Sequence, residues 1–391
     1  MKEIAVLTGT RAEYGLLKPI MEEIQESNSL KLSVIVTGMH LSPRHGSTIN
    51  EIKNDGFDTT HTVNMLLDTD SHIGMAKSTG IAISGLAQKI ESIDPDYLLV
   101  LGDRIEAFAG AVSAAMMNIP VGHIAGGSIR GGGMIDESIR HAITRFAHLH
   151  FVQTEQNARI LRDVGEDSDR IYTVGAPALD VIANGDFAEG EEISSSLGVD
   201  TQERIIVVIQ HPVTTEAGKA GVQMQETLRA IEDVNSQIVI IHPNSDPGRE
   251  KIVDEIKDFS EKHEQVVGIP NLERKKYLGL LNVADVLVGN SSSGILEAPC
   301  FGTPVINVGT RQGSRPKPKL VHSVPHDRKE IKKKVQRILI EDQSQSIDCN
   351  RSPYYHGGAG EKIVDVLKSF EAEENLLNKI LHTDLNSTDQ G

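Results

Sequence analysis

The segment Gly289–Ala298, with the sequence GNSSSGILEA, has residue types that suit the binding of a phosphate group. Ser291, Ser292 and Gly294 lie between a short apolar run and an expected helix. There, phosphate oxygens can approach free N–H groups and the helix dipole favours negative charge. Glu297, one turn further on, can accept hydrogen bonds from a ribose diol. A helix capped by serines without any ligand is the alternative interpretation.

Charged residues also follow apolar runs in the N-terminal half. Arg11 lies in the sequence GTRAEYG, where its planar guanidinium can clamp a phosphate or remain solvated in a turn. Asp103 and Arg104 follow the apolar run Tyr97–Leu101, and Arg104 can keep Asp103 ionised or bind a phosphate. Alternatively, Asp103 caps the next helix and Glu106 completes a capping box.

A glycine-rich stretch at 126–133 precedes four charged or titratable residues of an expected helix. Asp136 and Arg140 are spaced to share one helical face, and so are Glu137 and His141. Acid–base catalysis needs a carboxylate and a partner within reach of each other, and this group supplies both. An ordinary charged first turn of a helix is the alternative. The glycines do not fit GxGxxG, so a dinucleotide site is not predicted.

Two histidines, His211 and His242, each follow an apolar run and precede a proline. Their equivalent positions in the second half of the chain predict a ligand site. A metal site is not predicted, because no carboxylate or third histidine lies at ligand spacing. His148 and His150 flank the start of another apolar run, and we expect them to be structural.

The elements that must position these residues are short strands alternating with longer amphipathic helices. The apolar runs are Ile4–Leu7, Val34–Val36, Tyr97–Leu101, Val121–Ile124, His150–Val152, Ile171–Val174, Ile205–Ile209, Ile238–Ile241, Val266–Ile269, Val286–Val288 and Val305–Val308. The stretches between them include Leu16–Ile24, Gly80–Ile90 and Glu106–Met117. This alternation predicts two doubly wound α/β domains, each with a parallel sheet covered on both faces. Ligands of such sheets bind outside the carboxyl ends of the strands, where the residues above are found.

The chain has 391 residues, too many for one ordinary hydrophobic core. We predict an N-terminal Rossmann-like domain at 1–183 and a C-terminal one at 184–356, joined within the polar stretch 184–196. A helix at 357–370 is expected to return to the first domain, and 371–391 to form a polar tail that is frayed or loose.

Composition excludes several functional classes. The net charge of −16 and the absence of Trp argue against nucleic acid and anionic membranes as partners. Two cysteines are too few for a disulfide framework or a thiolate zinc site. No apolar run approaches the roughly 18 residues of a membrane helix. We therefore expect a cytoplasmic protein.

Taken together, the motifs resemble one family, the hydrolysing UDP-N-acetylglucosamine 2-epimerases of sialic acid pathways. The matching segments are GTRAEYG at Gly9–Gly15, GDR with a following acid at Gly102–Glu106, DESIRHAITRFAHLHF at Asp136–Phe151, HPVTTE at His211–Glu216 and GNSSSGILEAPCFGTPVINVGTRQ at Gly289–Gln312. The likeness runs from about Lys2 to about Phe370. It implies two Rossmann-like domains facing across a cleft, a GT-B-like arrangement, with UDP bound mostly by the C-terminal domain.

The resemblance also implies roles for individual residues. By motif, Arg11, His211, Ser291, Ser292, Glu297 and Arg311 would hold UDP, and Asp103, Arg104, Asp136 and Glu137 would face the sugar. Together with the residues singled out above, this predicts two sets. The predicted catalytic residues are Asp103, Asp136, Glu137 and His211, and the predicted substrate-binding residues are Arg11, Arg104, Arg140, His242, Ser291, Ser292, Gly294, Glu297 and Arg311. No cofactor and no metal are implied, the substrate is a nucleotide sugar, and the protein is expected to be a homo-oligomer.

The implied reaction has two steps. A carboxylate removes the C2 proton while the C1–O bond to UDP breaks, which gives a 2-acetamidoglucal, and water then adds to give free N-acetylmannosamine. The family usually reads HIEGGE after the fourth strand, whereas this chain reads HIAGGS at His123–Ser128. Ala125 and Ser128 thus replace two acids, one of them a catalytic candidate of the family, and Glu137 or Glu106 is a candidate replacement.

This departure leaves three further interpretations open. The same chemistry can act on a UDP- or GDP-linked 2,4-diacetamido trideoxy sugar of the legionaminic acid type. The chain can be a glycosyltransferase of the same architecture, which would need an acceptor. It can also be a regulator that binds a nucleotide sugar without catalysis, as Ala125 suggests.

Overall fold

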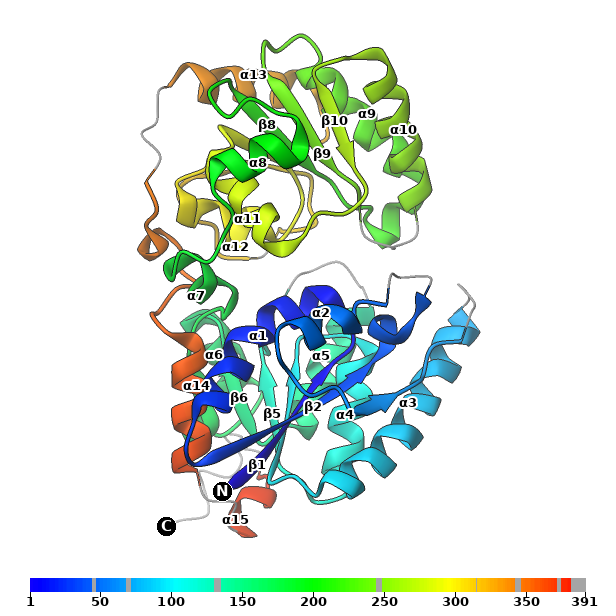
Figure 1. The fold of residues 1–391 in the computed structure, drawn as a ribbon, viewed down its shortest axis with the longest axis vertical. Coiled ribbons are helices and arrows are strands. Elements are labelled where there is room, and N and C mark those ends of the chain that lie inside the picture. Colours follow the sequence, from blue (N-terminus) through cyan, green and yellow to red (C-terminus); the bar gives the residue numbers. More distant parts are fainter. Residues whose placement is uncertain are drawn as a thin grey trace. The chain divides into compact units, whose positions relative to one another are not determined.

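The computed structural model describes residues 1–43, 47–67, 72–129, 135–243, 248–313, 315–341, 346–370 and 374–380. These residues form two compact units (Figure 1). The first unit contains the described residues up to 129, those at 135–180 and those from 356 onward. The second unit contains the described residues of 181–355. The chain therefore enters the second unit after Asp180 and returns to the first at His356.

The first unit is built on a seven-stranded sheet in the order β3-β2-β1-β4-β5-β6-β7, and every strand pair is parallel. The strands are β1 (Lys2–Thr8), β2 (Leu30–Thr37), β3 (His61–Val63), β4 (Tyr97–Leu101), β5 (Val121–Ile124), β6 (Leu149–Val152) and β7 (Ile171–Thr173). All residues of β4, β5 and β6 are buried. Continuous apolar sequences form these strands because helices cover both faces of the sheet.

The helices of the first unit are α1 (Arg11–Glu26), α2 (Ile49–Asn54), α3 (His72–Ile93), α4 (Ile105–Met116), α5 (Ile135–Phe146), α6 (Glu155–Asp163), α14 (Ala359–Ser369) and α15 (Glu374–Leu377), with α7 (Ala178–Ala183) at the boundary of the units. Alternate residues of β1 enter two cores. Ile4 joins the core formed with α1 and α14, and Ala5 the core formed with α3, α4 and α5. Helix α14, distant in sequence, packs on α1 through Ile363 and Leu367.

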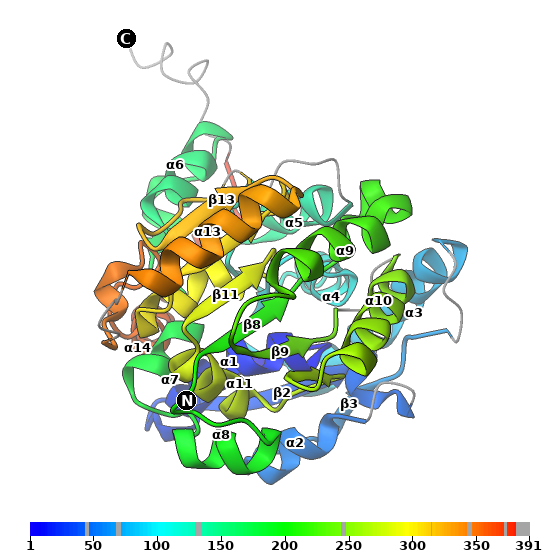
Figure 2. The same cartoon turned by 90° about the horizontal axis from the view of Figure 1, so that it is seen from above.

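The second unit contains a six-stranded parallel sheet in the order β10-β9-β8-β11-β12-β13. Its strands are β8 (Ile205–Ile209), β9 (Gln237–Ile241), β10 (Val266–Ile269), β11 (Val286–Gly289), β12 (Val305–Val308) and β13 (Val321–Val324). Its helices are α8 (Gly190–Leu197), α9 (Ala220–Ile231), α10 (Arg249–Lys262), α11 (Arg274–Val283), α12 (Ser293–Leu296) and α13 (Arg328–Ile340). Helices α9, α10 and α13 share one core with alternate residues of β8, and Figure 2 shows them beside the strands.

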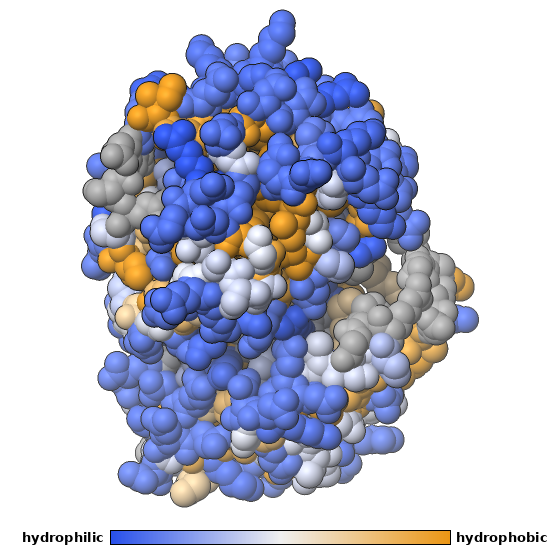
Figure 3. All heavy atoms as spheres, turned by 45° about the horizontal axis from the view of Figure 1, so that its top comes forward, coloured by the Kyte–Doolittle hydropathy of each residue, from blue (hydrophilic) through white to orange (hydrophobic). Residues whose placement is uncertain are grey.

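The prediction of two doubly wound α/β domains is confirmed by these two sheets. The strands β3 and β13 were not predicted, and both are short strands at sheet edges. Helix α8 occupies part of the stretch in which we expected a polar join, and its Ile193 is buried. Within the described residues, no helix combines the length and apolarity needed to span a bilayer. The face drawn in Figure 3 is mostly hydrophilic, in keeping with the net charge of −16.

Candidate active site

The strand order marks one point in each sheet where a ligand is expected. Both sheets run outward in two directions from a central pair, β1 and β4 in the first unit and β8 and β11 in the second. Loops that leave such a pair in opposite directions open a crevice at the carboxyl ends of the strands. Arg11 and Asp103 follow β1 and β4, and His211 and Ser291 follow β8 and β11. These four predicted residues therefore lie at the two switch points, and the others follow β4, β5, β9, β11 and β12.

In the first unit, Asp103 forms an ion pair with Arg140 of α5. The Arg140 side chain is almost fully buried, and its Nη1 also donates a hydrogen bond of 2.7 Å to the carbonyl oxygen of Ser128. Burial lowers the pKa of the Arg140 guanidinium to about 10, so it stays charged at neutral pH. Helix α4 begins at Ile105 with Arg104 as its N-cap residue. Arg104, and not Asp103, is therefore the N-cap residue, and the Asp103 carboxylate is paired with a buried cation.

Arg104 pairs with Glu106, whose side chain is fully buried. The distance from Arg104 Nε to Glu106 Oε2 is 3.3 Å, and the Glu106 charge raises the pKa of Arg104. A Cβ atom at Gly9 would lie 2.6 Å from Glu106 Cγ. Glycine at position 9 is therefore required for this buried carboxylate to fit beside the end of β1.

Glu13 is a second buried carboxyl group near Arg104. Its Oε2 accepts a hydrogen bond of 3.0 Å from the backbone N–H of Gly9, and its own N–H is capped by Thr10 Oγ1 at 3.3 Å. Burial, together with the nearby charge of Glu106, raises the pKa of Glu13 to about 7. Sequence analysis did not single out Glu13, although the T-x-x-E spacing from Thr10 is a capping-box signal.

The two acids of α5 lie in its first turn. Glu137 Oε2 is 3.7 Å from Arg140 Nη1, and Glu137 Oε1 is 3.6 Å from His141 Nε2. Asp136 is close enough to Arg104 for its charge to raise the pKa of that guanidinium. Together with Asp103, these side chains make one group of alternating charges at the carboxyl edge of the sheet.

Two other positions belong to this edge. Arg11 Nε forms an ion pair of 3.0 Å with Glu51 Oε2 of α2. Ala125, which stands where the resemblance implies an acid, has a φ of 63° and donates its N–H to the carbonyl oxygen of Phe151 at 2.9 Å. The backbone after β5 is thus in the left-handed region at this alanine.

In the second unit, Asn290 joins three of the loops. Its side chain brackets the backbone of His211, with Oδ1 accepting from the His211 N–H at 2.7 Å and Nδ2 donating to the His211 carbonyl at 2.9 Å. The Asn290 carbonyl accepts from Arg311 Nη1 at 3.3 Å and from Gln312 Nε2 at 3.0 Å. Asn290 therefore fixes the loops after β8, β11 and β12 to one another.

The three serines make a compact turn after β11. Ser293 Oγ donates to Ser291 Oγ at 2.9 Å, and the Tyr277 hydroxyl donates to Ser293 Oγ. Ser292 is the N-cap residue of α12, but its side chain makes no capping hydrogen bond. Helix α12 has only four residues, so its dipole is small and the hydroxyl groups are the main donors of this turn.

Glu297 is buried and paired with Arg274, at the start of α11. Arg274 Nη2 lies 2.6 Å from Glu297 Oε1. Although burial lowers the pKa of Arg274, the charge of Glu297 outweighs that effect and the net shift is upward. Arg274 and Tyr277 were missed by sequence analysis, because nothing in the stretch around them marks a site.

The two remaining predicted residues lie nearby in the same unit. His242 follows β9 and is partly buried, and burial lowers the pKa of its imidazole. Gly294 is buried in α12, where a Cβ atom would lie 2.9 Å from Val305 Cγ1 of β12. Its place in the structure is thus against the sheet.

Comparison with known proteins decides the family. The family model for UDP-N-acetylglucosamine 2-epimerase matches residues 22–368. The chain belongs to this family. It is 36% identical to the UDP-N,N'-diacetylbacillosamine 2-epimerase (hydrolyzing) of Legionella pneumophila over 97% of this chain and 99% of that protein. It is 35% identical to the UDP-N-acetylglucosamine 2-epimerase of Neisseria meningitidis serogroup B, over 85% of this chain and 86% of that one.

The fold of this 2-epimerase family member also matches a solved structure. A crystal structure of UDP-GlcNAc 2-epimerase from Neisseria meningitidis bound to UDP-GlcNAc has a TM-score of 0.78 and 21% sequence identity to it. The match covers 94% of this chain and 99% of that one. The predicted family and fold class are both confirmed.

Proposed function

We propose that this protein converts UDP-N-acetylglucosamine to N-acetylmannosamine and UDP, with inversion at C2 and hydrolysis of the bond to UDP. One observation carries this proposal: the two switch points hold complementary chemistry. The turn at one of them offers hydroxyl donors and the paired carboxylate of Glu297. At the other, Asp103 is paired with the buried Arg140, and the buried Glu106 is paired with the exposed Arg104. The Neisseria meningitidis relative at 35% identity supports the choice of sugar.

The second unit is proposed to bind the UDP part. Ser291 and Ser292 supply hydroxyl donors to the diphosphate, and Arg311 adds a charge that stabilises the departing UDP. Glu297 accepts hydrogen bonds from the ribose through its carboxylate. Arg274 orients that carboxylate by its contact of 2.6 Å.

The first unit is proposed to act on the sugar. The C1–O bond breaks with its electron pair leaving on UDP, and a carboxylate takes the C2 proton, so that the C2–H electrons form the C1–C2 double bond. Water then adds its OH to C1, and a second acid delivers a proton to C2 from the opposite face. We assign the two acid–base roles to Asp103 and to the pair Asp136 and Glu137, because all three lie at one sheet edge near the buried Arg140 and the exposed Arg104.

A second candidate substrate is favoured by a separate observation. Ala125 and Ser128 replace two acids of the family pattern, so the surroundings of the sugar differ. The Legionella pneumophila relative, named for UDP-N,N'-diacetylbacillosamine, matches 97% of this chain. The same elimination and hydration would then act on a 2,4-diacetamido trideoxy sugar.

Incubation with each nucleotide sugar, followed by NMR of the UDP and sugar products, tests both candidates. We expect free N-acetylmannosamine and UDP from UDP-N-acetylglucosamine without an acceptor. Faster turnover of UDP-N,N'-diacetylbacillosamine than of UDP-N-acetylglucosamine would identify the diacetamido sugar as the substrate. UDP release only after addition of an acceptor would point to a glycosyltransferase, and binding of both sugars without turnover to a regulator. Either of these last two results would overturn the proposal.

A further inference from the structure

The described part of the C-terminal segment, 374–380, is docked on the first unit. Leu376 is buried in the core that β1, α1 and α14 share. Arg170 donates hydrogen bonds to the backbone carbonyls of Leu376 at 2.9 Å and Asn378 at 3.2 Å. The segment is therefore held both by apolar contacts and by its backbone.

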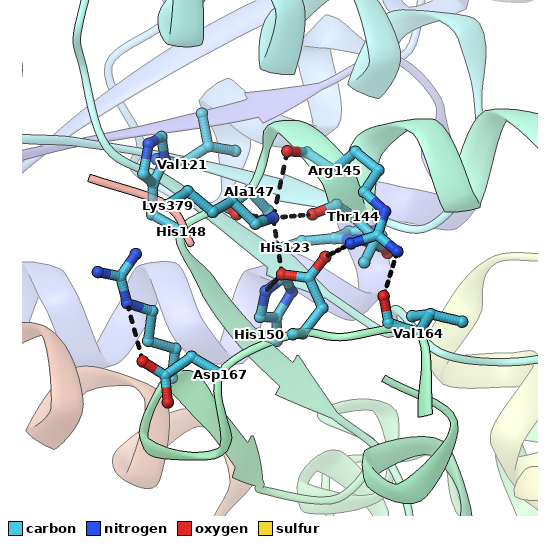
Figure 4. Close-up of polar contacts among 12 residues, drawn as sticks. Val121, His123, Thr144, Arg145, Ala147, His148, His150, Val164, Asp167 and Lys379 are labelled. Carbon is cyan, nitrogen blue, oxygen red and sulfur yellow. Dashed lines mark hydrogen bonds and ion pairs between the residues drawn. The ribbon is translucent and has the colours of Figure 1, made fainter. Parts of the chain in front are cut away.

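Lys379 of this segment binds the C-terminal end of α5 (Figure 4). Its Nζ donates to the carbonyl oxygens of Thr144 at 2.7 Å, Arg145 at 3.2 Å and Ala147 at 2.8 Å. The last carbonyls of a helix have no partner within the helix, and a cation there also interacts favourably with the helix dipole. One ammonium group from the end of the chain thus satisfies the end of α5.

The ammonium is itself anchored by a buried carboxylate. Lys379 Nζ is 2.7 Å from Glu166 Oε2, which also lies 3.1 Å from His150 Nε2, and Glu166 Oε1 lies 2.8 Å from Arg145 Nη1. Burial alone would raise the pKa of Glu166, but the hydrogen bonds and charges of His150 and Lys379 outweigh it and lower that pKa. Removing the ammonium would leave a buried carboxylate with one cation fewer, which is strongly unfavourable.

The opposite end of the same helix carries site residues. Arg140 of α5 holds Asp103 and contacts Glu137. Helix α5 has 12 residues, about 18 Å at 1.5 Å per residue, so a shift or rotation at its last turn is transmitted to its first. A second link joins the last turn to the end of β4. Thr144 Oγ1 lies 3.4 Å from His123 Nδ1, and His123 Nε2 lies 2.8 Å from the carbonyl oxygen of Gly102, next to Asp103.

We propose that Lys379 is a positioning residue for the acid–base groups on α5, which it sets by clamping the far end of that helix to Glu166. This inference rests on the proposed function, because it assumes that Asp103 and the acids of α5 act on the sugar. Lys379 contacts Ala147, which precedes β6, and so lies at the amino edge of the sheet, away from the proposed site residues at the carboxyl edge.

The chain offers a matched control in Lys2. Its Nζ donates to the carbonyl oxygens of Leu367 at 3.2 Å and Lys368 at 2.9 Å at the end of α14, which carries none of the proposed site residues. Lys379→Met and Lys2→Met both remove an ammonium donor from the carbonyls at the end of a helix of the same unit, and Lys379→Met also removes the ion pair with Glu166. Only one of the two helices reaches the site.

Steady-state kinetics of the full-length variants test the proposal. We expect kcat of Lys379→Met to fall by about tenfold or more with KM within about twofold of the wild type, since misplaced groups slow chemistry more than binding. We expect Lys2→Met to keep kcat within about twofold, and Lys379→Arg, which restores the charge, to recover most of the loss. Equal kcat values for Lys379→Met and Lys2→Met would overturn the proposal.

Amide hydrogen exchange provides a second readout that does not depend on activity. In Lys379→Met, the hydrogen-bonded amides of residues 139–143 should exchange faster than in the wild type or in Lys2→Met. Faster exchange confined to residues 374–380 would contradict a positioning role. If the wild type turns over neither nucleotide sugar, the proposed function fails, and the exchange comparison still decides whether Lys379 sets α5.

Discussion

At the scale of residues, the site depends on carboxylates that arginine side chains hold in place. Asp103 is held by Arg140, Glu106 by Arg104 and Glu297 by Arg274. Arginine suits these positions because its fork stays charged when buried and donates in several directions at once. Each carboxylate is therefore held in a fixed orientation by an arginine.

Replacement of Asp103 by Asn tests the catalytic assignment. The amide oxygen can still accept from Arg140, but the side chain can no longer take or deliver a proton. We expect kcat to fall by at least about a hundredfold, within the range for loss of a general acid or base, while UDP affinity changes less than about twofold. Kinetics and calorimetric titration with UDP measure both. The control is Asp233→Asn, which changes an exposed ion pair of the second unit. A large loss of UDP affinity in Asp103→Asn would contradict the assignment and place Asp103 in the nucleotide site.

Glu13 predicts a pH dependence of stability. Its pKa is raised in the folded protein from 4.5 to about 7, so the folded state binds more protons between these values than the unfolded state. Protonation of Glu13 therefore contributes its full stabilisation of the folded state below about pH 4.5, and this contribution is lost as the pH rises through 7. Glu13→Gln removes this titration. Between pH 5 and pH 8, the free energy of unfolding of the wild type should fall relative to that of Glu13→Gln, by up to about 3 kcal/mol. Denaturant unfolding of both proteins at pH 5 and pH 8 measures this. The same difference in free energy of unfolding between wild type and variant at both pH values would contradict the prediction.

At the scale of elements, the sequence predicted the central strands well. Strands β4 and β8 are unbroken apolar runs because helices bury both of their faces. Strands β3 and β13 lie at sheet edges, where one neighbour is missing and a short mixed sequence suffices. The places of polar residues such as Asp103 and Ser291 after the strands could be predicted because loop polarity stands out against apolar runs. Arg274 could not, because its role depends on α11 meeting Glu297, a contact between distant segments.

The turn after β11 makes a prediction about stability. Gly289 has a φ of 139°, and a Cβ atom there would lie 2.0 Å from the carbonyl oxygen of Ile209 in β8. Gly289→Ala must therefore push β11 away from β8, and we expect a loss of several kcal/mol, more than the roughly 1–2 kcal/mol of left-handed strain alone. Gly185→Ala is the control, because Gly185 has a φ of 75° but its Cβ would meet no atom of the described residues within 4 Å. Thermal melts of both variants measure the difference, and equal melting temperatures would show that β11 can shift without loss.

At the scale of the whole molecule, the two units differ in how the chain builds them. Among the described residues, the second unit comes from a single range of the chain, 181–355, whereas the first needs residues from 356 onward. Helix α14 supplies Ile363, Val364 and Leu367 to the core on α1. The N–H of Gly360 also donates to Asp180 Oδ2 at 2.9 Å and ties the returning helix to the first unit.

This difference predicts unequal behaviour of two fragments. A fragment of residues 181–355 retains its entire sheet and the core between β8, α9, α10 and α13, so we expect it to melt cooperatively. A fragment of residues 1–180 loses α14 and exposes the apolar face of α1. Loss of three buried aliphatic side chains removes about 5–9 kcal/mol at 1.5–3 kcal/mol each, which is comparable to the whole stability of a domain.

Circular dichroism melts and the dispersion of amide NMR signals compare the two fragments. Addition of a peptide of residues 356–380 should restore cooperative melting to fragment 1–180. A sharp melt of that fragment alone would show that α14 is not needed for the first unit to fold.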